Sequence, residues 1–295
     1  MDSLSDFFNE PLVEEKENVL LIDYSNLSIR NLYGLEYDPT DVTYVGYKNG
    51  MLMSIKKLVK EFKPSRLIFC MESHDGNWRK EIYPEYKANR KGERDASKID
   101  FDSFFAHNDK FVEDLSKCMK NAQFLKIPHL EADDLIALTV MNKPEWNITL
   151  ISTDKDFHQL HAYKNFKQYD PIKNEFIHVL NPSAALMEKI VRGDKNDNIP
   201  PLKKGIGTKT FSKIYQTGVE EWISMNMLQE QFDRNTKLIA FKSIPVEYIP
   251  KVVNELDNFK KEPFENRELF NLVVNNGLGC FMSKITDFCQ VMKQI

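Results

Sequence analysis

The sequence predicts an α/β fold in which helices flank a central, mostly parallel sheet, followed by a helical C-terminal region. Three short runs, at Asn18–Asp23, 66–71 and 147–152, are almost continuously apolar. Such runs are typical of parallel strands that are buried on both faces of a sheet. Segments with helical spacing of apolar residues separate them, as expected when crossover helices join parallel strands.

Helices are expected at 44–62, at 102–121 and at 131–141, because apolar residues recur there at intervals of three and four. The segments Phe166–Asp170 and 175–179 flank turn-forming residues and predict a β-hairpin.

The predicted organisation changes near residue 181. Asn181 and Pro182 are typical of a helix start, and the residues after them are predicted to be almost wholly helical. We therefore expect a flexible acidic leader at 1–17, an α/β domain at 18–181 and a helical domain at 182–295.

The net charge of −4 is distributed unevenly along the chain. Residues 1–17 hold six acidic and one basic side chain, which leaves a charge of +1 on the other 278 residues. If nine further carboxylates form one site, the residues outside that site and outside 1–17 carry a strongly positive net charge. An acidic chain can therefore present a basic surface to nucleic acid. Composition alone leaves an even mixture of solvated charges as an open alternative.

Simple features of the sequence exclude a membrane protein, a disulfide-rich secreted protein and a zinc protein. No apolar run approaches the roughly 20 residues of a membrane span, and the acidic N-terminus is unlike a secretory signal. The four cysteines lack CxxC spacing. We expect a reduced, soluble, cytoplasmic protein without membrane contact.

Acidic residues follow each of the predicted parallel strands. Asp23 and Glu72 follow the first two strands, and Asp154 and Asp156 follow the third. Ligands bind beyond the carboxyl ends of such strands, so these side chains should converge with acids from a helix start and from the GDKNDN loop. The candidate metal ligands are Asp23, Glu72, Glu131, Asp133, Asp134, Asp154, Asp156, Asp194 and Asp197.

Clustered carboxylates need cations, because two unit charges about 4 Å apart repel by about 4 kcal/mol at an effective dielectric of 20. Oxygen ligands without His or Cys favour Mg²⁺, with Mn²⁺ as a substitute, over zinc. Two such ions are the usual apparatus for phosphodiester cleavage. Any one of these acids is more often a helix cap or a turn residue, but the convergence of four groups favours a metal site.

Two segments are predicted to contact phosphates. The segment 78–94 interleaves basic residues with tyrosines, which offer charge and stacking faces; a solvated helix face is the alternative. In 203–213, two glycines precede a predicted helix, whose free backbone N–H groups favour a phosphate; an ordinary turn is the alternative. The candidate nucleic-acid contacts are Arg79, Tyr86, Lys91, Lys203, Lys204, Gly205, Gly207 and Lys209.

The motifs LIDYSN, IFCME, YPEYKANRKG, LEADDLIA, ISTDKDFHQL and GDKNDNIPPLKKGIGTKT, in this order, resemble the 5′-nuclease superfamily. This superfamily includes flap endonucleases, the 5′-nuclease domain of bacterial DNA polymerase and phage RNase H. The tail LFNLVVNNGLGCFMSKITDF resembles the end of the T-even phage RNases H, which extends the resemblance from about residue 18 to the C-terminus.

The resemblance implies a PIN-like nuclease domain with a basic arch around 74–105, in which Lys87 and Arg90 contact the scissile phosphate. It also implies two metal ions, with Asp134 in a supporting position. The ligands or near-ligands of the first ion would be Asp23, Glu72, Glu131, Asp133 and Asp154, and those of the second would be Asp156, Asp194 and Asp197. The GIGTKT segment would be a helix–turn–helix element that holds duplex DNA, in some members through K⁺.

Two features depart from the family pattern. The family usually has Asp where Glu72 stands, so Asp75, three residues further on, is a competing ligand. The linker PLKK between DNIP and GIG is one residue longer than is common, which affects the predicted DNA-binding turn.

The expected function is a magnesium-dependent 5′-3′ nuclease of a bacteriophage, acting in the infected host cell. It would act as a monomer that removes RNA primers from RNA–DNA hybrids and cuts 5′ flaps in DNA replication, with a single-strand DNA-binding protein as a candidate partner. The apolar helix near 285–292 is one docking candidate, although its spacing favours burial. The alternatives are a PIN-like single-strand ribonuclease and a catalytically silent junction-binding protein.

Overall fold

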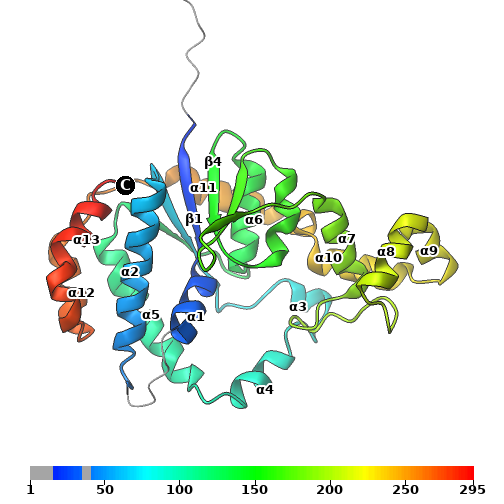
Figure 1. The fold of residues 1–295 in the computed structure, drawn as a ribbon, viewed down its shortest axis with the longest axis horizontal. Helices are drawn as coiled ribbons and strands as arrows, with labels where there is room; N and C mark the ends of the chain where they lie inside the picture. The colour runs from blue at the N-terminus through cyan, green and yellow to red at the C-terminus, as the bar shows by residue number, and fades with distance from the viewer. Residues whose placement is uncertain (1–15, 35–40) are drawn as a thin grey trace, which may run out of the picture.

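The computed structural model describes residues 16–34 and 41–295. The predicted leader at 1–17 lies almost entirely outside these ranges. One sheet has the strand order β3-β2-β1-β4-β5-β6 (Figure 1). Its strands are β1 (Asn18–Asp23), β2 (Arg66–Cys70), β3 (Ala122–Leu125), β4 (Asn147–Ile151), β5 (Phe166–Asp170) and β6 (Glu175–Ile177). The first five strands are parallel and β6 is antiparallel to β5, which confirms the predicted sheet and hairpin.

Helices cover both faces of this sheet (Figure 1). One face packs against α1 (Tyr24–Gly34), α2 (Val45–Phe62), α5 (Phe101–Cys118), α12 (Asn266–Asn275) and α13 (Ile285–Met292). The other packs against α6 (Ala132–Asn142) and α11 (Ile249–Asn258). In β1, Leu20 and Ile22 enter the first core, while Val19 and Leu21 enter the second. This division explains why the strand is apolar without interruption.

The remaining helices lie around the carboxyl ends of the strands or project beside them (Figure 1). They are α3 (Arg79–Ile82), α4 (Asn89–Asp95), α7 (Pro182–Arg192), α8 (Thr208–Thr217), α9 (Val219–Met225) and α10 (Gln229–Ile239). Asn181 caps α7 by accepting the Ala184 N–H at 2.9 Å, as the helix-start signal predicted. No helix in the described ranges combines the length and apolarity that a membrane crossing requires.

The sequence analysis does not predict several elements, among them β3, α1 and the 3₁₀ helix Lys155–Ala162. The helix expected at 102–121 ends at Cys118, and Ala122–Leu125 then adds the outermost parallel strand. This strand is only four residues long and contains Gln123, whose amide donates to the Glu255 carbonyl at 2.8 Å. A strand this short, with a polar residue inside it, gives no apolar run to detect.

The C-terminal helices share their core with the α/β region. Phe288 of α13 is fully buried in the same cluster as Met51 of α2 and Phe104 of α5. Its ring also lies 5.4 Å from that of Phe281, measured between centroids. The proposed boundary near residue 181 therefore marks a change of secondary structure, and the core continues across it.

We predict that Phe288→Ala lowers the free energy of unfolding by about 3–5 kcal/mol, because it removes a fully buried aromatic ring. Phe270→Ala is the matched control, since Phe270 is 48% exposed on the neighbouring helix α12. Urea unfolding followed by circular dichroism and by tryptophan fluorescence should give one coincident transition in both variants. A separate, shifted transition in Phe288→Ala alone would show that the helical region folds independently.

Candidate functional site

Parallel pairing brings the acidic ends of three strands to one edge of the sheet. Asp23 lies opposite Cys70 of β2, and the preceding residue of β1 lies opposite Ile151 of β4. Glu72 and Asp154 follow those partners within three residues. The carboxyl edge of the parallel sheet, where the sequence predicts the site, therefore brings these side chains together.

The first carboxylate group lines a cavity of about 340 Å³ at this edge. Its members are Asp23, Glu72, Asp133 and Asp154. Burial raises the pKa of Asp23 to about 6, and the charges of Asp154 and Glu72 contribute to the rise. Burial also raises the pKa of Asp133 well above its usual range, and the charges of Asp23 and Asp154 raise it further. The charged forms repel one another, so this group favours a bound cation.

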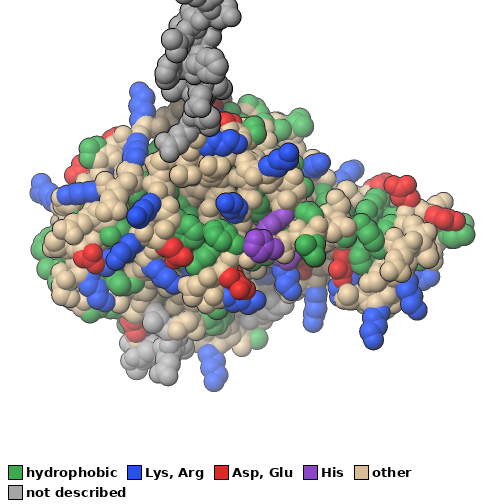
Figure 2. All heavy atoms as spheres, turned by 45° about the horizontal axis from the view of Figure 1, so that its top comes forward, with side chains coloured by type: hydrophobic (Ala, Val, Ile, Leu, Met, Phe, Trp, Pro, Cys, Tyr) green, Lys and Arg blue, Asp and Glu red, His purple; other side chains and the backbone are tan. Residues whose placement is uncertain are grey.

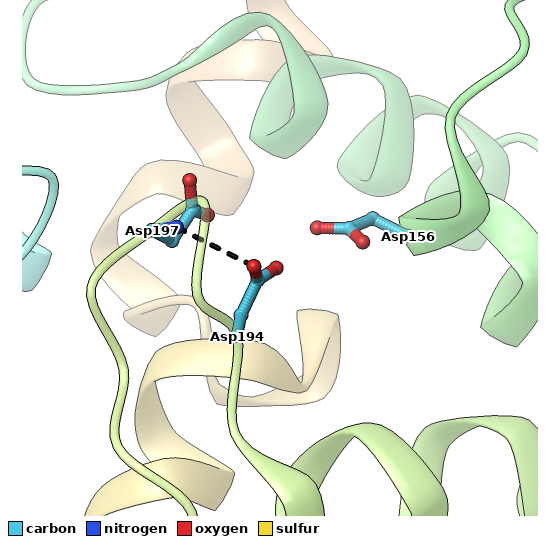
Figure 3. Close-up of side chains that lie close together, drawn as sticks. All are labelled: Asp156, Asp194 and Asp197. Carbon is cyan, nitrogen blue, oxygen red and sulfur yellow. Dashed lines mark hydrogen bonds between the residues drawn. The ribbon is translucent and has the colours of Figure 1, made fainter. Parts of the chain in front are cut away.

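Asp156, Asp194 and Asp197 form the second carboxylate group, with one oxygen of each within 4.8 Å of the others (Figure 3). The Lys189 ammonium contacts Asp156 and lies 2.7 Å from Asp194 Oδ2. Burial raises the pKa of Asp156 to about 6 even though Lys189 opposes the shift. Burial alone would also raise the pKa of Asp194, but Lys189 and two backbone N–H groups lower this pKa overall.

Both groups present only carboxylate oxygens, the ligands that Mg²⁺ and Mn²⁺ prefer. Oxygens bound to Mg²⁺ at about 2.1 Å stand at most about 4.2 Å apart. Of three oxygens on one octahedral ion, at least two pairs are adjacent and lie about 3 Å apart, so the second group must contract around an ion to bind it through all three residues. The donor chemistry and the spacing fit a divalent cation.

The loop that carries Asp194 and Asp197 is fixed by its backbone. Gly193 has a φ of +68°, and a Cβ at this position would lie 2.3 Å from the Ile199 carbonyl oxygen. Asp194 and Ile199 exchange two backbone hydrogen bonds of 2.9 and 2.7 Å, which close the loop. The GDKNDN segment thus holds both aspartates facing Asp156 from across the site (Figure 3).

Arg79 is buried, at 3% exposure, against Glu131 and Asp134. Its guanidinium donates to the two oxygens of Asp134 at 2.7 and 2.9 Å, and to Glu131 Oε2 at 3.1 Å. It also donates to the Leu238 carbonyl at 2.8 Å. The prediction that Arg79 contacts nucleic acid is therefore wrong. Asp134 has no exposed surface and supports Glu131 through a capping box.

Tyr86, Lys87 and Arg90 bring the predicted arch against the carboxylates. The Tyr86 hydroxyl donates to Glu131 at 2.9 Å and to Asp197 at 3.2 Å. The Lys87 ammonium contacts Glu131, and Arg90 donates to Asp197 Oδ1 at 2.8 Å. Burial opposes ionisation of Glu131, but Lys87 and then Arg79 lower its pKa to about 2. Tyr86 is 2% exposed, so the prediction that it offers a stacking face to nucleic acid is wrong.

A cavity of about 640 Å³ separates the arch from the start of α5. Lys87, Arg90, Lys91 and Arg94 line one part of it, and Glu72 and Glu131 line another. Lys91 is exposed, as a phosphate contact requires. Positive side chains therefore face the space that leads to the carboxylates.

The glycine segment lies on the lobe formed by α8 and α9, at the opposite end of the molecule from α12 and α13 (Figure 1). Gly205 has a φ of +86° and Gly207 precedes α8, with open space around both. Lys203, Lys204 and Lys209 are all exposed. Figure 2 shows basic side chains along one edge of this lobe and acidic ones along the opposite edge. The helix–turn–helix assignment stays a prediction.

Glu72 and Asp75 differ in their surroundings. Glu72 lines both the 340 Å³ and the 640 Å³ cavities. Asp75 accepts a hydrogen bond from the Ser73 hydroxyl at 2.9 Å. Because Glu72 and Asp23 line the same cavity, the structure favours Glu72 over Asp75 as the residue facing Asp23.

Sequence reasoning misses Lys189 and Arg30. Lys189 contacts two acids of the second group. The sequence feature that could have indicated this contact is its position in the last turn of the helix that ends at GDKNDN. Arg30 lines the 340 Å³ cavity from α1, with one guanidinium nitrogen buried and without a hydrogen-bond partner. Because α1 is not predicted, no pattern placed Arg30 near the site.

Comparisons with known proteins agree with this geometry. A family model described as the 5′-3′ exonuclease, N-terminal resolvase-like domain, matches residues 18–190. Ribonuclease H of Enterobacteria phage T4 is 28% identical over 299 residues, covering 92% of this chain and 96% of that protein. Flap endonuclease Xni of Shewanella baltica is 26% identical over 212 residues, covering 67% of this chain and 74% of that protein.

Solved structures show the same fold. The T5 D15 protein co-crystallised with metal ions has a TM-score of 0.61 at 18% identity, over 93% of this chain and 99% of that one. The catalytic core of Rad2 in complex with a DNA substrate has a TM-score of 0.53 at 14% identity, over 94% of this chain and 92% of that one.

We predict that Arg79→Met lowers the free energy of unfolding by about 3–5 kcal/mol, because it leaves the carboxylate of Asp134 buried without its charged partner. Lys80→Met, at the exposed neighbouring position, should change it by less than about 0.5 kcal/mol. Urea denaturation measures both. Unchanged stability in Arg79→Met, together with weakened DNA binding, would restore Arg79 as a nucleic-acid contact.

Proposed function

The chain belongs to the 5′-3′ exonuclease family, and from this premise we propose that it is a metal-dependent nuclease that cleaves phosphodiester bonds at 5′ ends and 5′ flaps. One observation carries the proposal: two carboxylate groups and the cations Lys87 and Arg90 converge at one edge of the sheet. This combination offers sites for divalent ions beside positive charge for a phosphate.

We propose RNA–DNA hybrids and branched DNA as substrates, and the removal of RNA primers during lagging-strand replication as the role. The similarity to the phage T4 ribonuclease H over 92% of the chain supports this choice, as does the similarity to flap endonucleases. Replication of a bacteriophage would place the protein in the cytoplasm of the infected cell. A monomer is sufficient, because one chain supplies every element of the site.

The metal ligands of this proposal are those of the two carboxylate groups, with Glu131 beside them. Bound divalent ions, Mg²⁺ by preference and Mn²⁺ as a substitute, would supply the positive charge that stabilises the attacking and leaving oxygens of a phosphodiester. Lys87 and Arg90 now pair with Glu131 and Asp197. In the complex with substrate they would instead bind the scissile phosphate and hold it in line for attack.

The lobe of α8 and α9 would hold the duplex. The first N–H groups of α8 follow Gly207, and free N–H groups at a helix start attract phosphates. Lys203, Lys204 and Lys209 add exposed charge around this turn. A K⁺ ion between the GIGTKT backbone and a phosphate belongs to the same proposal. Such contacts position a duplex without reading its sequence.

The two alternatives fit the structure less well. A catalytically silent junction-binding protein has no need of an intact carboxylate set, whereas both groups are complete here. A single-strand ribonuclease has no need of the basic lobe. The proposed single-strand DNA-binding partner does not dock through the apolar residues of α13, because Phe288 and Met292 are fully buried.

We predict that Asp156→Asn loses nearly all cleavage of a labelled 5′-flap DNA in Mg²⁺, while its affinity for that DNA stays within a few-fold of the original. The reason is that the substitution removes one charge from the second carboxylate group and leaves the basic contacts intact. Asp233→Asn, at an exposed position on α10, is the control and should cleave normally. Full activity of Asp156→Asn would refute the assignment of the second metal site.

We also predict that Glu72→Gln raises the Mg²⁺ concentration needed for half-maximal cleavage, because Glu72 lies in the cavity with Asp23. Asp75→Asn serves as the matched variant and should leave that concentration nearly unchanged, since Asp75 is held by Ser73. Magnesium titrations of both variants measure the difference. The reverse order would transfer the ligand role to Asp75.

A further inference from the structure

A second basic cavity lies away from the carboxylates. It has a volume of about 520 Å³ and is enclosed by the start of α2, the middle of α5 and the segment after α12. Lys48, Lys110, His107 and Thr43 contribute its polar side chains. None of these residues belongs to the nuclease site described above.

Lys48 is a largely buried side chain that lines this cavity. The residue is only 4% exposed, and its ammonium makes no hydrogen bond or ion pair within the described part of the chain. Burying an unpaired charge is unfavourable. Burial lowers the pKa of Lys48, and the positive charge of Lys110 lowers it further. Two ammonium groups therefore face the same space.

The charges of the nearest acids, Asp41 and Asp114, partly offset this lowering of the Lys48 pKa, but among the described residues neither acid forms an ion pair with Lys48 or Lys110. Asp41 accepts the N–H groups of Val45 and Gly46 at 3.1 and 3.0 Å, at the start of α2. Asp114 accepts the side-chain amide of Asn276 at 3.1 Å. An anion entering the cavity would supply the missing counter-charge.

The cavity lies close to the path of the proposed substrate. Phe101 and Asp102 of α5 line the 640 Å³ cavity beside the arch, while Ala106 and Lys110 of the same helix line the second cavity. At 1.5 Å per residue, four to nine residues along the helix separate the two by about 6–14 Å. A nucleic-acid strand advances about 3.4 Å per phosphate, so the two cavities stand only a few nucleotides apart.

We propose that this cavity binds a phosphate group through Lys48 and Lys110, and that the phosphate belongs to the backbone of the nucleic-acid substrate. The identity of the donor rests on the proposed nuclease function, whereas the phosphate site itself does not. Free inorganic phosphate has the same chemistry, and the experiment separates the two sources.

The experiment uses Lys48→Met and Lys110→Gln in the full chain. Lys117→Gln is the control, because it removes the same charge, lies on the same helix as Lys110 and does not line the cavity. Lys48→Met should fold with a melting temperature at or above that of the parent in phosphate-free buffer, because it removes a desolvated charge. Lys110 is exposed, so Lys110→Gln tests the site without altering the core.

The first measurement is the rise in melting temperature caused by inorganic phosphate. The second is the affinity for 5′-flap DNA in metal-free buffer over a range of salt concentrations. Lys110→Gln should bind the DNA several-fold more weakly, with a salt slope reduced by about 1. Lys48→Met should also bind the DNA more weakly than Lys117→Gln does. Inorganic phosphate should raise the melting temperature of Lys48→Met by less than it raises that of Lys117→Gln.

If Lys48→Met and Lys110→Gln behave like Lys117→Gln in both measurements, the proposed phosphate site is wrong. A lost phosphate effect with unchanged DNA binding would overturn the nucleic-acid source. Neither measurement requires cleavage, so both can be interpreted even if the nuclease proposal fails. Likewise, failure of the phosphate site would leave the nuclease proposal intact.

Discussion

Electrostatic repulsion among the carboxylates at one sheet edge is the constraint on which the rest of the site depends. Parallel strands place these acids together, and burial raises the pKa values of Asp23 and Asp156 to about 6. Four cationic side chains oppose the repulsion from four different elements or loops. They are Arg79, Lys87, Arg90 and Lys189. The ion pairs that balance this charge also tie the arch and the helical region to the sheet.

The sequence was sufficient for the features that depend on local pattern. Apolar runs predicted β1, β2 and β4, because a strand buried on both faces has no room for polar residues. The acids at their ends followed from the rule that parallel strands share one binding edge. The nuclease motifs then predicted the family, which the match over residues 18–190 confirms.

Pairing across long sequence separations could not be predicted in the same way. The sequence predicts Arg79 and Tyr86 as nucleic-acid contacts, because basic side chains offer charge and tyrosines offer stacking faces. Their partners Glu131 and Asp134 lie 45 to 55 residues further along the chain. A charge count cannot distinguish a solvated arginine from one that is buried against two carboxylates. Lys189 and Arg30 were missed for the related reason that only tertiary packing brings either side chain to the site.

The shared core has a consequence for the order in which the chain folds during synthesis. The core on the α6 and α11 side includes residues up to Leu256. The core on the α2 and α5 side also requires Phe288 and Met292. A nascent chain can therefore complete the first side while the second still exposes apolar surface. Until its last helix emerges, that open face is where a chaperone would bind or a premature contact would form.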